Sequence, residues 1–249
     1  MNYKISAFSD IGNVRKTNQD CYLCSQGQLG GAPAAFLVVA DGMGGLSKGE
    51  LASSMAIEKL ELWWDNISSQ SFLLPVDEIS RRLDNALYDI HRDIFLLEEE
   101  IGERIGTTLS VLILNGYQAI IKHIGDTRIY VIKDGDITQL TEDQTYENLL
   151  IREGKLDPSQ RDVQKNQALV NALGVSDELE ISTSFGMTSP NAMFLLASDG
   201  FYNGVHGLIE EFNWSRVMDL DRTLSVLKDL ILKGPAKDNL TAILVKVVN

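Results

Sequence analysis

The stretch Val38-Val39-Ala40-Asp41-Gly42-Met43-Gly44-Gly45 joins an apolar run to an aspartate and then to a glycine-rich turn. The valines favour an extended strand, and the glycines let the backbone turn sharply where that strand ends. Four more aspartates end apolar or β-rich stretches beside a glycine or a small polar residue, namely Asp20, Asp126, Asp199 and Asp238. Such positions can converge on one edge of a sheet, so the pattern predicts a cluster of carboxylates.

A carboxylate cluster is strongly repulsive unless a cation occupies it. Hard divalent ions take oxygen ligands, and Mg²⁺ or Mn²⁺ suits carboxylates, a backbone carbonyl and several waters. The three histidines, His91, His123 and His206, form no pattern with acidic residues that would favour zinc. The sequence therefore predicts a metal-dependent hydrolase with Mn²⁺ or Mg²⁺ as its cofactor.

Six blocks of sequence follow one another in a familiar order: residues 9–20, 41–45, 106–108, 125–128, 198–200 and 238–239. This order resembles the metal-dependent serine/threonine protein phosphatases of the type-2C family in their compact bacterial form. The resemblance runs from about residue 8 to residue 247. It implies an α+β fold, a four-layer αββα sandwich in which two antiparallel sheets are flanked by helices.

The resemblance also implies a two-metal core, in which Asp41, Asp199 and Asp238 are the catalytic ligands. Asp41 would bridge the two metals, and the carbonyl of Gly42 would complete the second. Asp199 and Asp238 would hold the first metal, while Asp20 would reach the second directly or through a water. Two metals about 3.5–4 Å apart can activate a water and neutralise phosphoryl oxygens.

Further positions take supporting roles by the same resemblance. Asp126, together with Asp199, matches the position that binds a third, weaker ion. Arg15 matches the phosphate-binding arginine, whose planar fork suits two phosphoryl oxygens. Asn239 would orient its neighbour, and Asn203 stands where an aspartate is common and would weaken the third site.

Three more positions depart from the family pattern. Met43 stands where many eukaryotic members have a histidine that serves the leaving group, and methionine cannot donate a proton. Gln19 occupies a position often filled by glutamate, and Gln144 replaces a frequent histidine. None of these changes removes a ligand of the two-metal core, so we expect an active enzyme.

Length, charge and cysteine content narrow the class of protein. A chain of 249 residues is compatible with a single domain, residues 1–249, and the net charge of −13 argues against nucleic acid or an anionic membrane as partner. Cys21 and Cys24 lie three apart in a predicted strand, so they face opposite sides and are expected to be core thiols rather than a redox pair. The sequence starts without an apolar signal segment and has no run near the ~20 residues of a membrane span. We expect a cytoplasmic monomer.

Apolar periodicity predicts the main elements. Strands are expected at residues 3–8, 21–24, 36–40, 109–114, 119–124, 129–132, 193–197 and 241–247, with hairpin turns at Asn115-Gly116 and Asp134-Gly135. Helical spacing predicts helices at residues 51–64, 77–100 and 222–232. The first of these has the apolar set Leu51, Met55, Ile57, Leu60 and Trp64. An irregular stretch, residues 145–168, includes a short helix at 147–154 and matches the mobile flap of the family; we call it the flap segment.

Three functions are compatible with these features. The first is hydrolysis of phosphoserine and phosphothreonine monoesters in proteins, with a phosphorylated protein as substrate and a serine/threonine kinase pathway as partner. The second is a non-catalytic relative of the same fold that binds a partner, which the retained aspartates disfavour. The third is a metal-dependent hydrolase of small phosphate esters or nucleotides, although the sequence has no P-loop.

Overall fold

The computed structural model describes residues 1–44, 48–69, 74–160, 168–176, 178–205 and 207–248. Within these residues the strands form two sheets, and every pairing is antiparallel. The first sheet has the order β1 (Asn2–Asp10), β11 (Leu240–Val248), β10 (Met193–Ala197), β7 (Arg128–Lys133) and β8 (Asp136–Gln139). The second has the order β2 (Asp20–Leu29), β3 (Ala32–Gly44), β5 (Leu109–Asn115), β6 (Gln118–Ile124) and β9 (Ser182–Met187), and β4 (Ile105–Thr107) pairs with the end of β3.

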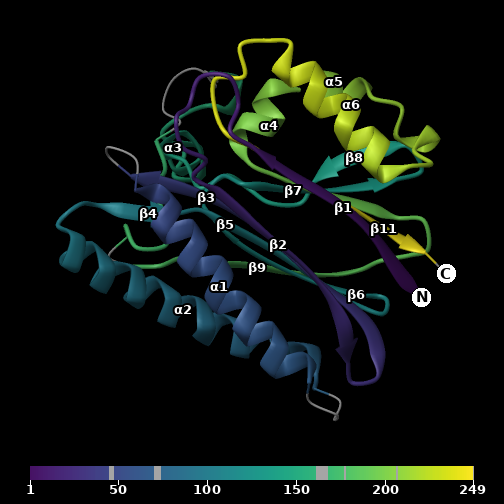
Figure 1. The fold of residues 1–249 in the computed structure, drawn as a ribbon, viewed down its shortest axis with the longest axis horizontal. Coiled ribbons are helices and arrows are strands. Elements are labelled where there is room, and N and C mark those ends of the chain that lie inside the picture. Colours follow the sequence, from purple (N-terminus) through teal and green to yellow (C-terminus); the bar gives the residue numbers. More distant parts are fainter. Residues whose placement is uncertain (45–47, 70–73, 161–167, 177, 206, 249) are drawn as a thin grey trace.

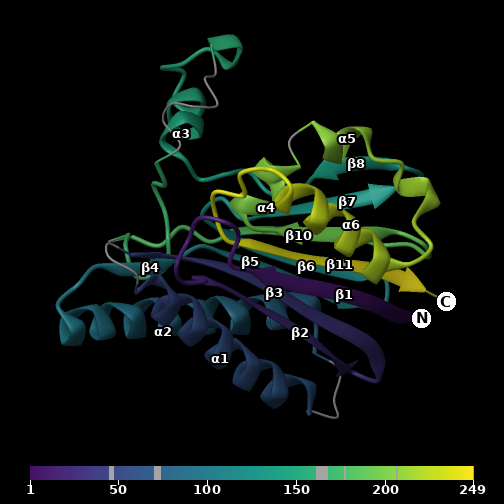
Figure 2. The same cartoon turned by 45° about the horizontal axis from the view of Figure 1, so that its top comes forward.

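Helices cover the outer faces of both sheets (Figure 1). The second sheet is covered by α1 (Gly49–Ser68) and α2 (Val76–Ile101), and the first by α4 (Asp199–Gly204), α5 (Leu208–Glu211) and α6 (Leu220–Leu232). The remaining helix, α3 (Tyr146–Arg152), stands clear of the sheets (Figure 2). Short 3-10 turns occur at Pro158–Gln160 and Trp214–Arg216. The arrangement confirms the predicted αββα sandwich.

Strand β3 shows why the layers stack. Phe36 and Val38 point into the apolar layer under α1 and α2, whereas Leu37 and Val39 point into the layer between the sheets. A strand buried on both faces needs apolar side chains at every position, which explains its unbroken apolar run. Phe36 also stacks on Trp64 of α1, with ring centroids 5.1 Å apart. A third apolar layer separates the first sheet from α4, α5 and α6.

Helices α1 and α2 lie where the sequence predicted them. One residue of the apolar set predicted for the first helix is exposed. Helix α1 buries Ala52, Ala56, Leu60 and Trp64, whereas Leu51 is 38% exposed. Leu51 precedes the buried positions by one residue, about 100° around the helix, so it turns towards solvent. Helix α2 buries an apolar stripe at helical spacing, made of Ile79, Leu83, Leu87, Ile90 and Ile94.

The two predicted hairpin turns join β5 to β6 and β7 to β8. Gly116, Asp134 and Gly135 have φ angles of 57°, 55° and 97°, the left-handed conformation that such turns require. Strands β4, β8 and β9 and helices α4 and α5 were not predicted. β9 could not be recognised from apolar alternation because it is an edge strand with an exposed, mostly polar sequence.

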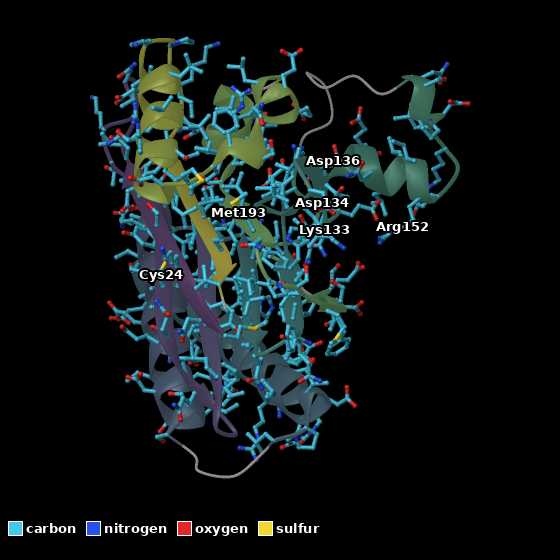
Figure 3. The ribbon with its side chains drawn as sticks, turned by 90° about the vertical axis from the view of Figure 1, so that its right-hand side faces the viewer. Cys24, Lys133, Asp134, Asp136, Arg152 and Met193 are labelled. Atoms are coloured by element: carbon cyan, nitrogen blue, oxygen red, sulfur yellow. The ribbon has the colours of Figure 1, made fainter. Side chains whose placement is uncertain are left out.

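Cys21 and Cys24 point to opposite sides of β2, as predicted. Cys24 packs against the layer between the sheets, and Cys21 lies 3.5 Å from the Ser53 hydroxyl of α1. Within the described residues both are free thiols and both are half-buried. Figure 3 shows Cys24 on the body of the molecule, far from Arg152 on the projecting α3. In the described part of the chain, no helix is long and apolar enough to cross a membrane.

His123 is a buried polar group that belongs to the packing of the sheet. On β6 its Nδ1 lies 3.0 Å from the Ser110 hydroxyl and its Nε2 lies 3.0 Å from the carbonyl oxygen of Glu142. Burial lowers the pKa of His123 to about 4, which the charge of Asp143 opposes and that of Arg128 reinforces. The ring is therefore neutral in the folded protein at neutral pH.

This burial predicts a pH-dependent stability. Between pH 6.5 and pH 4 the unfolded chain binds a proton at His123 that the folded chain does not, so stability falls as the pH falls through this window. We expect the difference in unfolding free energy, wild type minus His123→Gln, to decrease by about 3 kcal/mol between pH 7 and pH 4. Urea unfolding of both proteins at the two pH values measures it, and an unchanged difference would contradict the prediction.

Candidate metal centre

Four of the predicted aspartates line one cavity of about 310 Å³. Asp41 lies near the end of β3, Asp126 in the turn between β6 and β7, Asp199 at the start of α4, and Asp238 just before β11. The two sheets therefore bring their ends to the same place. The cavity, which we call the aspartate pocket, is lined by Arg15, Gln19, Asp41, Gly42, Met43, Thr108, Asp126, Leu169, Asp199, Asp238 and Asn239.

Asp20, the fifth aspartate, is buried beside this pocket. It pairs directly with Asp41 across β2 and β3. The Ser198 hydroxyl donates a hydrogen bond of 2.7 Å to its Oδ2. Its Oδ1 is buried and has no hydrogen-bond partner among the residues that the structure describes. An unpaired buried carboxylate oxygen is costly, and a cation is the partner that would satisfy it.

The backbone around Asp41 is tightly fixed. Its carbonyl oxygen accepts a hydrogen bond of 2.9 Å from the Thr108 amide and one of 3.0 Å from the Thr107 hydroxyl. A side chain at Gly42 would place its Cβ 2.3 Å from the carbonyl oxygen of Gly49 and 2.7 Å from that of Gln19. Only glycine fits here, so the Gly42 backbone can reach the wall of the pocket.

The carboxylates of the site lie in an unfavourable electrostatic environment. Burial, and then the charges of Asp20, Asp199 and Asp126, raise the pKa of Asp41 well above its usual range. Burial raises the pKa of Asp20 to about 6 and that of Asp126 to about 7, and it also raises the pKa of Asp199. The site therefore disfavours negative charge, and bound divalent cations would reverse that preference.

The donor set fits a hard divalent ion, although the side chains are not yet a closed ligand shell. Among the described residues, no group of three or more acidic, histidine or cysteine side chains is arranged to hold a metal ion. Asp238 is turned towards Arg15, with Nη2 2.5 Å from Oδ2, and Asp20 is turned towards Ser198. Mg²⁺ and Mn²⁺ prefer oxygen ligands, and the buried Oδ1 of Asp20, which has no hydrogen-bond partner among the described residues, is available as one.

Asn239 holds the loop that carries Arg15. Its Nδ2 donates to the carbonyl oxygens of Ile11 and Thr17, at 3.0 and 3.1 Å. Its Oδ1 accepts a hydrogen bond of 2.9 Å from the Gln19 amide. The guanidinium of Arg15 therefore reaches the pocket from a loop tied to the start of β11. Sequence reasoning gave Asn239 a supporting role but did not identify this loop as what it supports.

The positions that depart from the family pattern lie in different places. Met43 and Gln19 both line the aspartate pocket. Asn203 lies on an exposed part of α4 and lines a neighbouring cavity, together with Asp199 and Asp238, instead of the aspartate pocket. Within the described residues Asn203 does not line the aspartate pocket, and its expected effect on a third ion stays a prediction.

Gln144 connects three segments beside the pocket. Its Oε1 accepts hydrogen bonds from the Gly125 amide at 2.7 Å and from Asn171 Nδ2 at 2.6 Å. Its Nε2 donates to the Ser182 hydroxyl at 3.0 Å and to the carbonyl oxygen of Glu180 at 3.4 Å. One side chain thus ties the turn that carries Asp126 to the residues that follow the flap segment and to β9.

A second set of contacts, which the sequence did not indicate, holds the same turn between β6 and β7. Arg128 donates hydrogen bonds to both carboxylate oxygens of Asp143, among them Nε to Oδ1 at 2.9 Å and Nη2 to Oδ2 at 2.6 Å. Its guanidinium lies 3.7 Å from the centre of the Tyr202 ring. Consecutive residues, Asp143 and Gln144, therefore hold the chain on both sides of Asp126. Nothing local in the sequence indicates these partners, because they are 15 and 19 residues apart.

These contacts predict the effect of removing the Gln144 amide. Gln144→Met keeps the size of the side chain but leaves the Gly125 amide without its acceptor. We expect amide hydrogen exchange at Gly125 to accelerate about tenfold or more through local opening. The control is Gln118→Met, a glutamine exposed at the start of β6. Unchanged exchange at Gly125 in Gln144→Met would contradict the role.

The known proteins that this chain resembles are protein phosphatases. The family model of protein phosphatase 2C matches residues 14–244. Protein phosphatase PhpP of Streptococcus pneumoniae is 31% identical over 247 residues, which cover 98% of this chain and 97% of the relative. Serine/threonine protein phosphatase PstP of Mycobacterium tuberculosis is 28% identical over 251 residues, and this chain spans only 45% of the length of that relative.

A solved structure supports the same relationship. The catalytic domain of serine/threonine protein phosphatase PstP in complex with two manganese ions superimposes with a TM-score of 0.80 at 28% identity, covering 99% of both chains. Both chains therefore have the same two-sheet architecture over their whole compared length. Because the family model spans most of the sequence and this fold agrees with it, the chain belongs to the protein phosphatase 2C family.

Proposed function

We propose that this protein is a metal-dependent phosphatase that hydrolyses phosphoserine and phosphothreonine monoesters in proteins. The observation that carries the proposal is the aspartate pocket, where acidic side chains from both sheets meet an arginine from a third segment. Such a site can bind cations and a phosphoryl group side by side. Its relatives are named as protein phosphatases, which supports a phosphorylated protein as the substrate.

The residues that would hold two Mn²⁺ or Mg²⁺ ions follow from their positions. We assign Asp41 to both ions, the carbonyl of Gly42 and Asp20 to the second, and Asp199 and Asp238 to the first. When bound, such ions supply the charge that neutralises phosphoryl oxygens and lowers the pKa of the attacking water. Two manganese ions in the PstP catalytic domain support this number. We assign Asp126 to a third, weaker ion, with Asp199 as its partner.

Arg15 is proposed to bind the phosphoryl group. Its planar guanidinium can donate to two phosphoryl oxygens at once, which Lys in its place could not do. It is half-exposed at the edge of the pocket and paired with Asp238, so it is held close to the carboxylates without being one of the ligands. Met43 has no proton to donate, so the side chain at this position does not protonate the leaving oxygen.

The flap segment is proposed to contact the substrate protein. Its root is closed by antiparallel pairing, because the Tyr146 amide donates to the carbonyl oxygen of Ala168 at 2.8 Å and the Val170 amide donates to that of Gln144 at 3.0 Å. Leu169, beside this root, lines the aspartate pocket. From the root, α3 projects away from the body (Figures 2 and 3). Residues 161–167 of the segment lie outside the described residues.

The domain organisation, oligomeric state, location and partners are proposed from the phosphatase function. We propose that residues 1–249 act as one catalytic domain, as a monomer, in the cytoplasm. A phosphorylated protein would be its substrate, and a serine/threonine kinase pathway would supply that substrate. The acidic net charge of −13 supports a protein substrate more than nucleic acid or an anionic membrane surface.

Phosphate release from a phosphothreonine peptide tests the proposal. With Mn²⁺ we expect turnover that a chelator abolishes. Asp199→Asn should lower kcat/KM by about a thousandfold or more, roughly 4 kcal/mol in the barrier, because a proposed metal ligand loses its charge. The matched control is Asp221→Asn, an exposed aspartate at the start of α6, which should retain wild-type turnover.

The same assay separates the competing functions. Turnover of Asp199→Asn within about tenfold of wild type would contradict the metal role. Hydrolysis of nucleotides or p-nitrophenyl phosphate but of no phosphopeptide would favour the small-ester alternative. No turnover of any ester with Mn²⁺ or Mg²⁺ would favour a non-catalytic binding protein.

A further inference from the structure

A second cavity, of about 360 Å³, adjoins the aspartate pocket. The two cavities share Asp199 and Asp238 as walls. Apart from these aspartates the second cavity is mainly apolar, and we call it the side pocket. Its lining includes Gly200, Gly204, Leu230, Ile231, Pro235 and Ala236. Leu230 is 43% exposed, so apolar surface is available to a ligand there.

Two glycines of α4 shape the side pocket. A Cβ at Gly204 would lie 2.6 Å from Cγ2 of Ile231, and one at Gly200 would lie 2.0 Å from the carbonyl oxygen of Asn239. Neither position can take a side chain without moving its neighbours. Helix α4 therefore packs directly against the end of α6 and the start of β11, and this close packing fixes the position of the pocket wall that α4 provides.

The wall of the side pocket is tied to the loop that carries Arg15. Nδ2 of Asn13 donates to the carbonyl oxygens of Leu232 and Gly234, at 2.9 and 3.1 Å, and the Asn13 amide donates to that of Ala236 at 3.0 Å. Arg15 itself pairs with Asp238, one of the shared walls. The position of the proposed phosphate-binding group relative to the side pocket is thus set by hydrogen bonds.

We propose that the side pocket receives an apolar side chain of the substrate, from the residue directly before or after the phosphorylated serine or threonine. This inference rests on the proposed phosphatase function. Adjacent residues have Cα atoms 3.80 Å apart, so a chain whose phosphoryl group contacts Arg15 can place a neighbouring side chain across the shared aspartate wall. The cavity is at the small end of the range for ligand sites, which suits one side chain rather than a cofactor.

The chemistry of the walls selects the class of side chain. Leu230, Ile231, Pro235 and Ala236 offer apolar contact, which favours a leucine-like side chain over a polar one of the same size. Burying an acidic side chain against these apolar walls would cost its hydration. Lys237 also lines the cavity but is exposed, so its ammonium group can remain in water.

Paired phosphothreonine peptides test the side pocket with the full chain and Mn²⁺. The peptides differ only in leucine or asparagine at the position before the phosphothreonine in one pair and after it in the other. We expect one pair to show about tenfold higher kcat/KM for leucine, arising mainly in KM, since a pocket of this kind discriminates through apolar contact. Leu230→Asn should remove most of that preference and leave p-nitrophenyl phosphate turnover unchanged.

The control variant is Val226→Thr, which changes another exposed apolar residue of α6 one turn earlier and should keep the leucine preference. Equal kcat/KM for leucine and asparagine in both pairs would overturn the inference while leaving the phosphatase proposal intact. So would a preference that Leu230→Asn does not reduce, or an equal loss on p-nitrophenyl phosphate. Failure to hydrolyse any phosphate ester would overturn both proposals.

Discussion

Mutual repulsion among buried carboxylates is the constraint on which the rest of this structure depends. Asp20, Asp41, Asp126 and Asp199 come from separate segments, and burial raises the pKa of each. Such groups would separate if the chain around them could move. Holding them together requires strands and turns that are fixed by packing elsewhere, and the four-layer fold provides that support.

Different contacts hold the carboxylates in place. Asp20 and Asp41 are held by strand pairing and by apolar layers on both sides of β3. Asp126 is held by Gln144 and Asp143 acting on the residues around it. Because the scaffold fixes the proposed ligands in this way, cations could bind with little reorganisation of the backbone. Asp238, one of the proposed ligands, would turn from Arg15 towards a bound ion.

Sequence reasoning succeeded where a single physical signal dominates. Buried strands such as β3 and β10 have continuous apolar runs, and the aspartates at their ends mark the pocket. It failed for β9, whose exposed edge leaves no apolar pattern. For Asn203, one helical turn beyond Asp199, the sequence could not indicate that it lines the side pocket instead of the aspartate pocket. The contacts of Gln144 are long-range, so no local pattern indicates them.

The most direct test of the central claim is the unfolding free energy of wild type and Asp41→Asn, measured with and without Mn²⁺. If the pocket is a repulsive cluster that cations stabilise, the variant without metal should be at least as stable as wild type. Mn²⁺ at a hundred times its Kd should stabilise wild type by about 2.7 kcal/mol per site, and the variant by much less. Equal stabilisation of both proteins, or a variant that is much less stable without metal, would contradict the account.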